Sequence, residues 1–471
     1  MMRTLFVKEI RDAFASRRFW VILALCLVLI PLGIAVSLKD YQTRLQNYRE
    51  ALRIYREGTK QVQDILYGGG AKAFAPPASL SFMSLGLELV LPNVAETPAG
   101  QVDPPVVMRV NSNQGYDNLY EFFSGPLDLV FVVTVVMSLL AVILTFGAVS
   151  GEKESGTLGL VLSNSVSRAK VILAKVTANG LVLIVPFLLT MFASLMIIQL
   201  RAGSVLSDGG SWTSVGLGVL ISILLVGVFS NLGLLISSLT KQSVPALIVL
   251  LLAWAFLYGV YPRLSVVAAE SIYPLKSEAH VTLEKAQVRR DIEIGRDTEI
   301  DRAAKTMPQD LKSEAFKAGR REQQEIRDRY RAKLEESWRK IDRDIEGRRT
   351  FQYALINDIA RLSPVSSFMS AMAEVSRTSW LEFRQFKSLV GQYEDVLNRE
   401  IFDKEHFTKF SRGQLASNSA DPRAPAPVFN YLPMREDHLV RNVLPDVALL
   451  LLFNFILFAG AFVVFLRYDP R

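Results

Sequence analysis

The sequence predicts an all-α polytopic membrane protein with six transmembrane helices and a largely helical, coiled-coil-containing ectodomain built from two long loops. Two observations lead to this fold class. Half of the 471 residues are hydrophobic, and they gather in a few long stretches that are low in charge. The 53 Lys and Arg and 46 Asp and Glu residues fall mostly between these stretches. A soluble globular protein and a disordered chain are therefore excluded.

Six stretches are long and apolar enough to cross a bilayer, which takes about 18 or more residues of helix. A Lys, Arg or Asp at the bilayer centre costs about 2.5–3.5 kcal/mol, so length and lack of charge decide the assignment. The predicted spans are residues 19–37, 129–149, 171–198, 215–239, 244–260 and 443–466. Because so few residues separate the fourth and fifth spans, we expect a tight helical hairpin there.

Lys and Arg residues in the short loops predict the orientation. They precede the first span and occur in segment 150–170, in the hairpin and in the tail 467–471, whereas the loop between spans three and four has one Arg balanced by one Asp. The positive-inside rule then places both termini in the cytoplasm and the long segments 38–128 and 261–442 outside. A signal peptide is the alternative for the first span, but Glu9 and Asp12 precede it and its apolar stretch is too long.

The first outside segment begins with a predicted helix that continues from span one. Its apolar residues recur at spacings of three and four, with one step missing at Thr59; they are Tyr41, Leu45, Tyr48, Leu52, Tyr55, Val62 and Leu66. This is a heptad seam. Three glycines at 68–70 end the helix, and a Pro-rich stretch with a short β-like run at 106–110 follows.

The second outside segment begins with a highly charged arm, residues 281–350, in which acidic and basic residues alternate. One apolar stripe runs through it at helical spacing: Ile326, Tyr330, Leu334, Trp338, Ile341 and Ile345. We expect a long helix that packs against the helix at 41–66 or against a partner chain. Residues 351–407 are again helical in pattern, with a break at Pro364, and a Pro-rich stretch returns to the sixth span. Both stripes are interpreted first as helix contacts, with ligand binding as the alternative.

Segment 150–170 carries the strongest functional signal. Two carboxylates, Glu152 and Glu154, precede a Gly-Thr break, a short amphipathic helix and a basic return into the membrane. A short amphipathic helix of this kind can dock into a groove of a soluble partner.

This segment resembles the coupling segment of type-2 ABC transporter permeases, whose pattern runs Glu-x-Glu-x-Gly-Thr-Leu, then Leu-Ser-x-Pro-x-Ser-Arg, then Gly-Lys. The matching residues are Glu152, Glu154, Gly156, Thr157, Leu158, Leu162, Ser163, Ser167, Arg168 and Lys175. Ser165 and Ala174 replace the usual Pro and Gly. The resemblance implies that a separate ATPase docks on this segment.

The N-terminal residues 1–18 resemble the interfacial helix of the same family, which lies flat in the cytoplasmic leaflet. The residues that carry this resemblance are Phe6, Lys8, Glu9, Ile10, Arg11 and Phe14. The Pro-rich stretch around Pro76 and the Phe-Ser-Gly-Pro sequence that starts at Phe123 resemble a bacterial subgroup with enlarged periplasmic regions, often labelled multicopper-enzyme-maturation or gliding-type permeases. The resemblance implies a multi-pass protein of the bacterial inner membrane with two periplasmic segments.

The resemblance also implies the partners. The chain has no G-x-x-x-x-G-K-[ST] phosphate loop, so we expect ATP and Mg²⁺ to be bound by two copies of an ABC ATPase subunit, with no cofactor or metal in this chain. A second permease subunit, identical or different, would complete the pathway within the lipid bilayer. A periplasmic partner could bind the arm at 281–350; nucleic acid is not expected.

The candidate pathway residues are the polar groups inside the spans, Asn179, Ser222, Asn231 and Asn454, with Ser194 as a further polar group. None of these is ionised, so no proton or ion relay is expected, and Ser and Asn in spans bridge helices more often than they bind substrate.

Three functions follow from the sequence. The first is the permease subunit of an ATP-driven exporter. The second is mechanotransmission, in which the ATPase cycle moves the periplasmic helices to act on a partner without transport. The third is a membrane enzyme or receptor, for which the sequence offers no clustered catalytic residues. We therefore expect a non-catalytic subunit.

Overall fold

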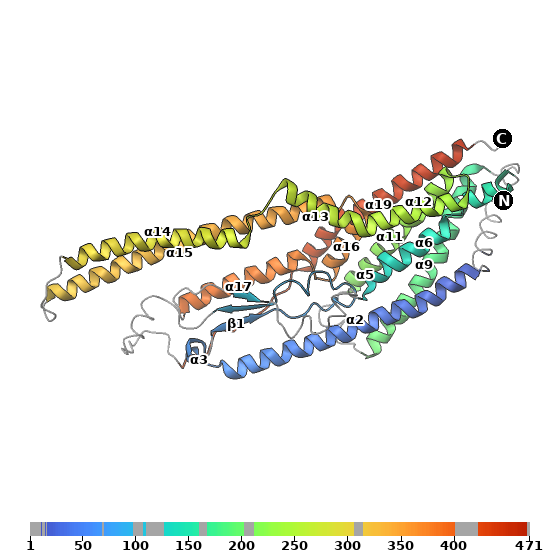
Figure 1. Cartoon of the computed structure of the whole chain (residues 1–471). Helices are drawn as coiled ribbons and strands as arrows, with labels where there is room; N and C mark the ends of the chain where they lie inside the picture. The colour runs from blue at the N-terminus through green and yellow to red at the C-terminus, as the bar shows by residue number, and fades with distance from the viewer. Residues whose placement is uncertain are drawn as a thin grey trace. The chain divides into compact units, whose positions relative to one another are not determined.

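The computed structural model describes residues 11, 15, 17–67, 70–97, 107–109, 127–159, 167–201, 212–305, 314–400 and 423–468. The predicted fold class is confirmed: the chain is mostly helical, and six helices are long and apolar enough to cross a membrane (Figure 1). The chain divides into two compact units, of which the first is Met1–Val260 with Ser363–Arg471 and the second is Tyr261–Leu362.

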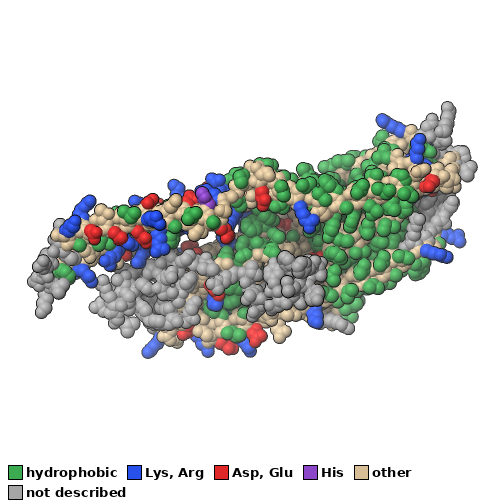
Figure 2. Space-filling view, viewed as in Figure 1, with side chains coloured by type: hydrophobic (Ala, Val, Ile, Leu, Met, Phe, Trp, Pro, Cys, Tyr) green, Lys and Arg blue, Asp and Glu red, His purple; other side chains and the backbone are tan. Residues whose placement is uncertain are grey.

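Each predicted span lies within one of the six candidate membrane helices. These are Phe19–Gly58, Leu129–Glu154, Arg168–Leu200, Trp212–Leu239, Ser243–Ile272 and Glu436–Arg467. Figure 2 shows the broad hydrophobic face that the membrane helices of the first unit present. Such a face is expected where lipid or another apolar helix replaces water.

Several of these helices are built from shorter elements. In chain order they are α2 (Arg17–Gly58); α5 (Leu129–Phe131), the π-helical turn η2 (Val132–Met137), α6 (Ser138–Thr145) and α7 (Ser150–Glu154); α9 (Arg168–Arg201); α11 (Trp212–Leu239); α12 (Ser243–Ala255) with the π-helical turn η3 (Phe256–Val260); and α19 (Glu436–Arg467). Helix α11 is central, since it packs against α6, α9, α12 and α19.

Helix α19 approaches α11 closely at Gly227. A Cβ atom at this position would lie 2.7 Å from Oδ1 of Asn454 on α19, so a larger residue would displace the Asn454 side chain. Small residues at helix interfaces are the usual means of close approach in membranes.

The helix predicted at 41–66 is shorter than expected. Helix α2 ends at Gly58, and a separate short helix, α3 (Val62–Tyr67), follows. The break falls where the apolar repeat misses its step, and the side chain of Asp64 accepts the backbone N–H groups of Lys60 and Gln61 at 2.9 and 2.8 Å. A side-chain acceptor of this kind favours a new helix start over a continuous helix.

The first unit also contains a small antiparallel sheet of order β1-β2-β3, of which the sequence predicted only the last strand. The strands are β1 (Ala71–Phe74), β2 (Val94–Thr97) and β3 (Val107–Arg109). Strands of three or four residues are too short for a clear period-two pattern. Two further helices, α16 (Pro364–Val375) and α17 (Trp380–Glu400), belong to the same unit. Phe386 and Val390 of α17 form a hydrophobic core with Ala73 and Ala95 of the sheet.

The second unit consists of α13 (Tyr261–Ile272), α14 (Glu278–Lys305) and α15 (Glu314–Ala360). The 47 residues of α15 span about 70 Å at 1.5 Å per residue. The predicted stripe packs against α14: Nε1 of Trp338 donates to the carbonyl of Lys285 at 3.3 Å, and the Lys285 ammonium pairs with Asp342 at 2.6 Å. The arm is thus two paired helices. The stripe packs against α14, whereas the sequence analysis expected it to pack against the helix at 41–66 or against a partner chain. Figure 2 shows their interleaved charges.

Candidate functional site

The candidate site is the segment 150–170, between α6 and α9. Its first helix, α7, begins against α11: Oγ of Ser237 accepts the backbone N–H groups of Val149 and Ser150 at 3.0 and 2.9 Å. The first N–H groups of a helix have no partner within the helix itself. Because a side chain of α11 satisfies them here, the start of α7 is fixed to α11.

Glu152 of α7 binds α9. Its carboxylate forms an ion pair with the ammonium of Lys175, which is only 7% exposed. A charge buried to this degree is stable only when it is paired. The Lys175 side chain therefore requires Glu152, and the pair joins α7 to α9.

Lys153 binds the end of α11. Its ammonium donates to the carbonyls of Ser238 and Thr240, and it lies 4.6 Å from the centre of the Tyr468 ring. The last carbonyls of a helix are unpaired and carry partial negative charge, so a cation is favoured there. A cation over an aromatic face adds to the attraction.

Glu154 binds the start of α12. Its Oε2 accepts the backbone N–H of Ser243 at 3.0 Å. An anion is favoured at a helix N-terminus for the same electrostatic reason that a cation is favoured at the other end. Three consecutive residues, Glu152, Lys153 and Glu154, therefore bind three different membrane helices, with signs that match two helix ends.

The chain turns sharply after these residues. Gly156 has a φ of +73°, a left-handed conformation that favours glycine. After the turn, Thr157 is exposed, whereas Leu158 is buried with Val171, Leu234 and Phe465. Leu158 thus anchors the segment in a hydrophobic cluster formed by α9, α11 and α19.

Arg168 completes the arrangement at the first turn of α9. Its guanidinium donates to the carbonyls of Leu466 and Tyr468 at 2.7 and 2.8 Å, at the C-terminal end of α19. The segment thus contacts four membrane helices through side chains, and the ends of these helices lie at one end of the bundle (Figure 1).

Other predicted residues are only partly described. Ser167 is exposed and accepts the backbone N–H of Lys170 through its carbonyl at 2.9 Å, while Leu162 and Ser163 lie outside the described residues. In the predicted interfacial helix, Arg11 is helical and exposed, and the other members, Phe6, Lys8, Glu9, Ile10 and Phe14, lie outside the described residues.

The structure brings two of the candidate pathway residues together and leaves the other two apart from them. Nδ2 of Asn231 donates to Oδ1 of Asn454 at 3.0 Å, so these two residues join α11 to α19. Ser222 donates to the carbonyl of Gly218 in its own helix at 2.7 Å, and Asn179 is half-buried on α9. The two asparagines thus form a hydrogen bond between helices, and Ser222 forms one within its own helix.

The candidate pathway residues left out two ionisable residues inside the predicted spans, of which Lys175 had been named only as part of the coupling motif. Lys175 lies in span three and Asp446, which is fully buried, lies in span six, so the spans contain ionisable side chains as well as the neutral polar ones that the sequence analysis considered. Both residues stand in otherwise apolar stretches, which is a signal that the sequence contained. The role of Lys153 had no such signal, because its partners are backbone carbonyls.

A contact between α6 and α12 was also missed. Nε1 of Trp254 donates to Oγ of Ser138 at 2.8 Å, and the Trp254 ring stacks on Tyr258 at 5.6 Å. These residues adjoin the π-helical turns η2 and η3, which are common at functional positions in helices.

A search of the curated proteins finds no match. A protein-family model, described as the ABC-2 family transporter protein, matches residues 3–469. This match covers nearly the whole chain, including the six candidate membrane helices and the segment between α6 and α9. The chain therefore belongs to the ABC-2 family of transporter proteins, as a multi-pass membrane component.

Proposed function

We propose that this chain is the permease subunit of an ATP-driven exporter of the bacterial inner membrane, and that segment 150–170 receives the motion of a separate ATPase subunit at the cytoplasmic face. The observation that supports this proposal is the binding of α9, α11 and α12 by Glu152, Lys153 and Glu154. A force on α7 acts on all three helices together. Coupling then requires that the ATPase bind two permease states with different affinity.

In this proposal two ATPase copies act on two permease subunits, identical or different, and the pathway lies near α6 and α12. The exposed apolar face of α12 supports this arrangement, since Val244, Ile248 and Leu252 are more than half exposed in the single chain. The two helices are also joined by Trp254 and Ser138. The enlarged outside segments fit the subgroup with large periplasmic regions.

The test compares Lys153→Met with Lys170→Met in the complex with its ATPase. Lys153 binds α11, whereas Lys170 is an exposed lysine of the same segment. Cys26 is replaced by Ala and a cysteine is placed at Leu252 on α12. The rate at which a thiol reagent labels this cysteine, with and without a non-hydrolysable ATP analogue, reports a change in the accessibility of α12. We expect the nucleotide to change the rate in the parent and in Lys170→Met but not in Lys153→Met. An unchanged nucleotide response in Lys153→Met would contradict the proposed route.

The second candidate function is mechanotransmission, and the paired helices α14 and α15 favour it. A helix of 47 residues braced by the pair Lys285–Asp342 is stiff enough to carry a movement over distance. Because Trp338 lies against Lys285, a short turn can replace residues 286–337. The remaining parts of α14 and α15 then keep their contact. An exporter keeps its transport after this deletion, whereas a mechanotransmitter keeps its ATPase activity and loses its effect on the periplasmic partner.

A further inference from the structure

The outer half of α2 borders two adjacent cavities in the first unit. Their volumes are about 440 and about 250 Å³, and they share Tyr48, Pro76 and Tyr431 among their lining residues. We call the two cavities together the α2 groove. The predicted heptad seam lines this groove: Tyr41 and Leu45 border the first cavity, and Leu52 and Tyr55 border the second.

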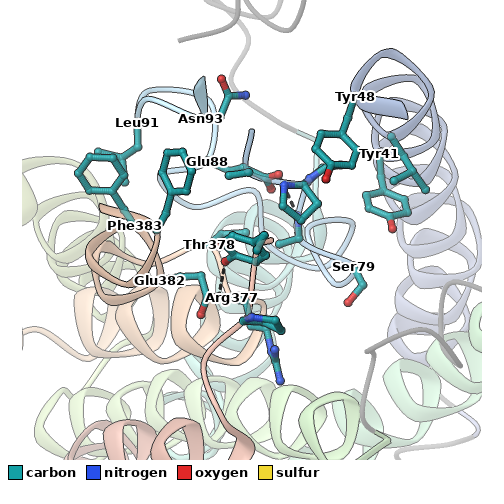
Figure 3. A pocket seen from close by; sticks show the side chains of 18 of the residues that line it. Tyr41, Tyr48, Ser79, Glu88, Leu91, Asn93, Arg377, Thr378, Glu382 and Phe383 are labelled. Atoms are coloured by element: carbon teal, nitrogen blue, oxygen red, sulfur yellow. Dashed lines mark hydrogen bonds between the residues drawn. The ribbon is translucent and has the colours of Figure 1, made fainter. Parts of the chain in front are cut away.

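The walls of the first cavity are mainly apolar and aromatic. Figure 3 shows Tyr41 and Tyr48 on one side, Leu91 and Phe383 on the other, and Glu88 between them. A volume near 440 Å³ lies within the range of sites that bind small molecules or part of a lipid chain.

The carboxylates that line the groove are already bound. Oε1 of Glu88 lies 2.7 Å from the guanidinium of Arg44 and accepts the N–H of Ala78, while Oε1 of Glu382 accepts the hydroxyl of Tyr431 at 2.6 Å. Burial raises the pKa of Glu88, and the charge of Arg44 opposes this rise.

The arginines of the groove are not bound in this way. Arg49 and Arg377 line the first cavity and Arg56 the second, and within the described part of the chain none of the three forms an ion pair. These three arginines outnumber Glu382, whose carboxylate accepts neutral donors, the Tyr431 hydroxyl and the N–H of Met434, so the net charge that the groove offers to a ligand is positive.

Arg377 has an unusual backbone conformation. It follows α16 with a φ of +59°, and the N–H of Thr378 donates to the carbonyl of Ala373 while that of Arg377 donates to the carbonyl of Glu374. These bonds form a Schellman motif, in which glycine is usual at this position. An arginine in a strained position at the edge of a cavity suggests that its side chain has a function.

We propose that the α2 groove binds an anionic lipid, with an acyl chain along the tyrosine and proline walls and the head group at Arg49 and Arg377. The location supports a lipid as the occupant, because Tyr41 lies about one helical turn beyond the predicted end of span one on the uninterrupted helix α2. The end of the groove lined by Tyr41 therefore lies near the surface of the bilayer. This proposal concerns binding alone and does not depend on transport.

The experiment uses the full chain in detergent with a photoactivatable phosphatidylglycerol and the matching phosphatidylcholine. We expect the anionic lipid to label peptides of the groove more strongly. Arg49→Glu and Arg377→Gly should each lower this labelling about threefold, as for a partly exposed ion pair. Arg53→Glu, on the same helix but outside both cavities, should leave it unchanged. Equal labelling by the two lipids, or equal loss in Arg53→Glu, would overturn the proposal.

Two further variants exclude unfolding as the cause. Arg377→Gly relieves the left-handed strain, so its melting temperature should rise while labelling falls. Ser79→Phe places a ring in the first cavity and should reduce labelling by both lipids. If Arg377→Gly is more stable and labels as strongly as the parent, the head group is not bound there and the proposal fails.

Discussion

Oε2 of Glu154 accepts the backbone N–H of Ser243 at 3.0 Å, so an acidic residue of the segment after α6 binds the first turn of α12. The preceding residue, Lys153, binds the last carbonyls of α11. Both sides of the turn in the α11–α12 hairpin are thus bound by neighbouring residues of opposite charge. We therefore expect the hairpin and α7 to move together.

Replacement of Glu154 tests its contact with α12. Glu154→Ala removes the acceptor of the Ser243 N–H, so amide exchange at the start of α12 should become faster; Glu154→Gln keeps an acceptor and should show a smaller effect. Hydrogen-exchange mass spectrometry of peptides covering 240–250 makes the measurement, with peptides from the middle of α11 as the control. Exchange in Glu154→Ala at the parent rate would mean that the contact does not stabilise α12.

The Glu152–Lys175 pair calls for a double-mutant cycle. Lys175→Met leaves Glu152 without its partner, and Glu152→Gln leaves a buried ammonium, so each should lower the free energy of unfolding by about 3 kcal/mol. The double variant leaves no unpaired charge and should lose less than the sum of the two. Denaturant titration of the purified chain gives these values; additive losses would show that the two residues act independently.

The two asparagines between α11 and α19 can be tested for two roles, as a hydrogen bond that joins the helices or as part of the transport pathway. Asn454→Leu leaves Nδ2 of Asn231 without its acceptor and should cost about 0.6–1.7 kcal/mol of stability. Asn231→Leu with Asn454→Leu should recover part of this loss. If both residues only bridge helices, the double variant keeps the nucleotide response of α12; if that response is lost while stability is kept, they belong to the pathway.

The pair of Arg44 and Glu88 predicts a pH dependence of stability. Arg44 is 3% exposed and lies 2.7 Å from Glu88. Burial raises the pKa of Glu88 and the charge of Arg44 opposes this rise, so the pKa rises further in Arg44→Met. A carboxyl whose pKa is higher in the folded state holds its proton more tightly there. Its contribution to stability is full below the pKa of the unfolded state, and this contribution is lost as pH rises through the pKa of the folded state.

Arg44→Met should therefore be less stable than the parent by about 3 kcal/mol at pH 8 and by clearly less at pH 5. Thermal unfolding at the two pH values measures the difference. Arg53→Met removes an exposed arginine of the same helix and should show no such dependence. A deficit in Arg44→Met that is equal at both pH values would show that Glu88 does not titrate in this range.

The spans were predictable because length and hydropathy alone decide them, and all six lie in helices. The end of helix α2 and the packing partner of helix α15 could not be predicted in this way. The break after Gly58 depends on a local hydrogen bond by Asp64, and the partner of the Trp338 stripe depends on which helix folds back on α15. Apolar spacing gives the face that a helix buries but not the element that covers it.

The candidate site was predictable as a segment but not as a structure. The motif pointed to Glu152 and Glu154 as surface for a partner, whereas the structure binds both to helices of this chain and leaves Thr157 exposed. The contacts of Lys153 and Arg168 are made to backbone carbonyls at helix ends, for which no residue pattern exists. Such contacts follow only from the packing of the helices.

Site-specific photo-crosslinking from this segment tests the central claim most directly. A photoreactive amino acid is placed at Thr157, which is exposed, or at Leu158, which is buried, in native membranes. Position 157 is expected to crosslink to an ATP-hydrolysing protein, and position 158 only to helices of the chain itself. A functional complex in which position 157 captures no ATPase would contradict the claim that this segment is where ATP hydrolysis acts on the permease.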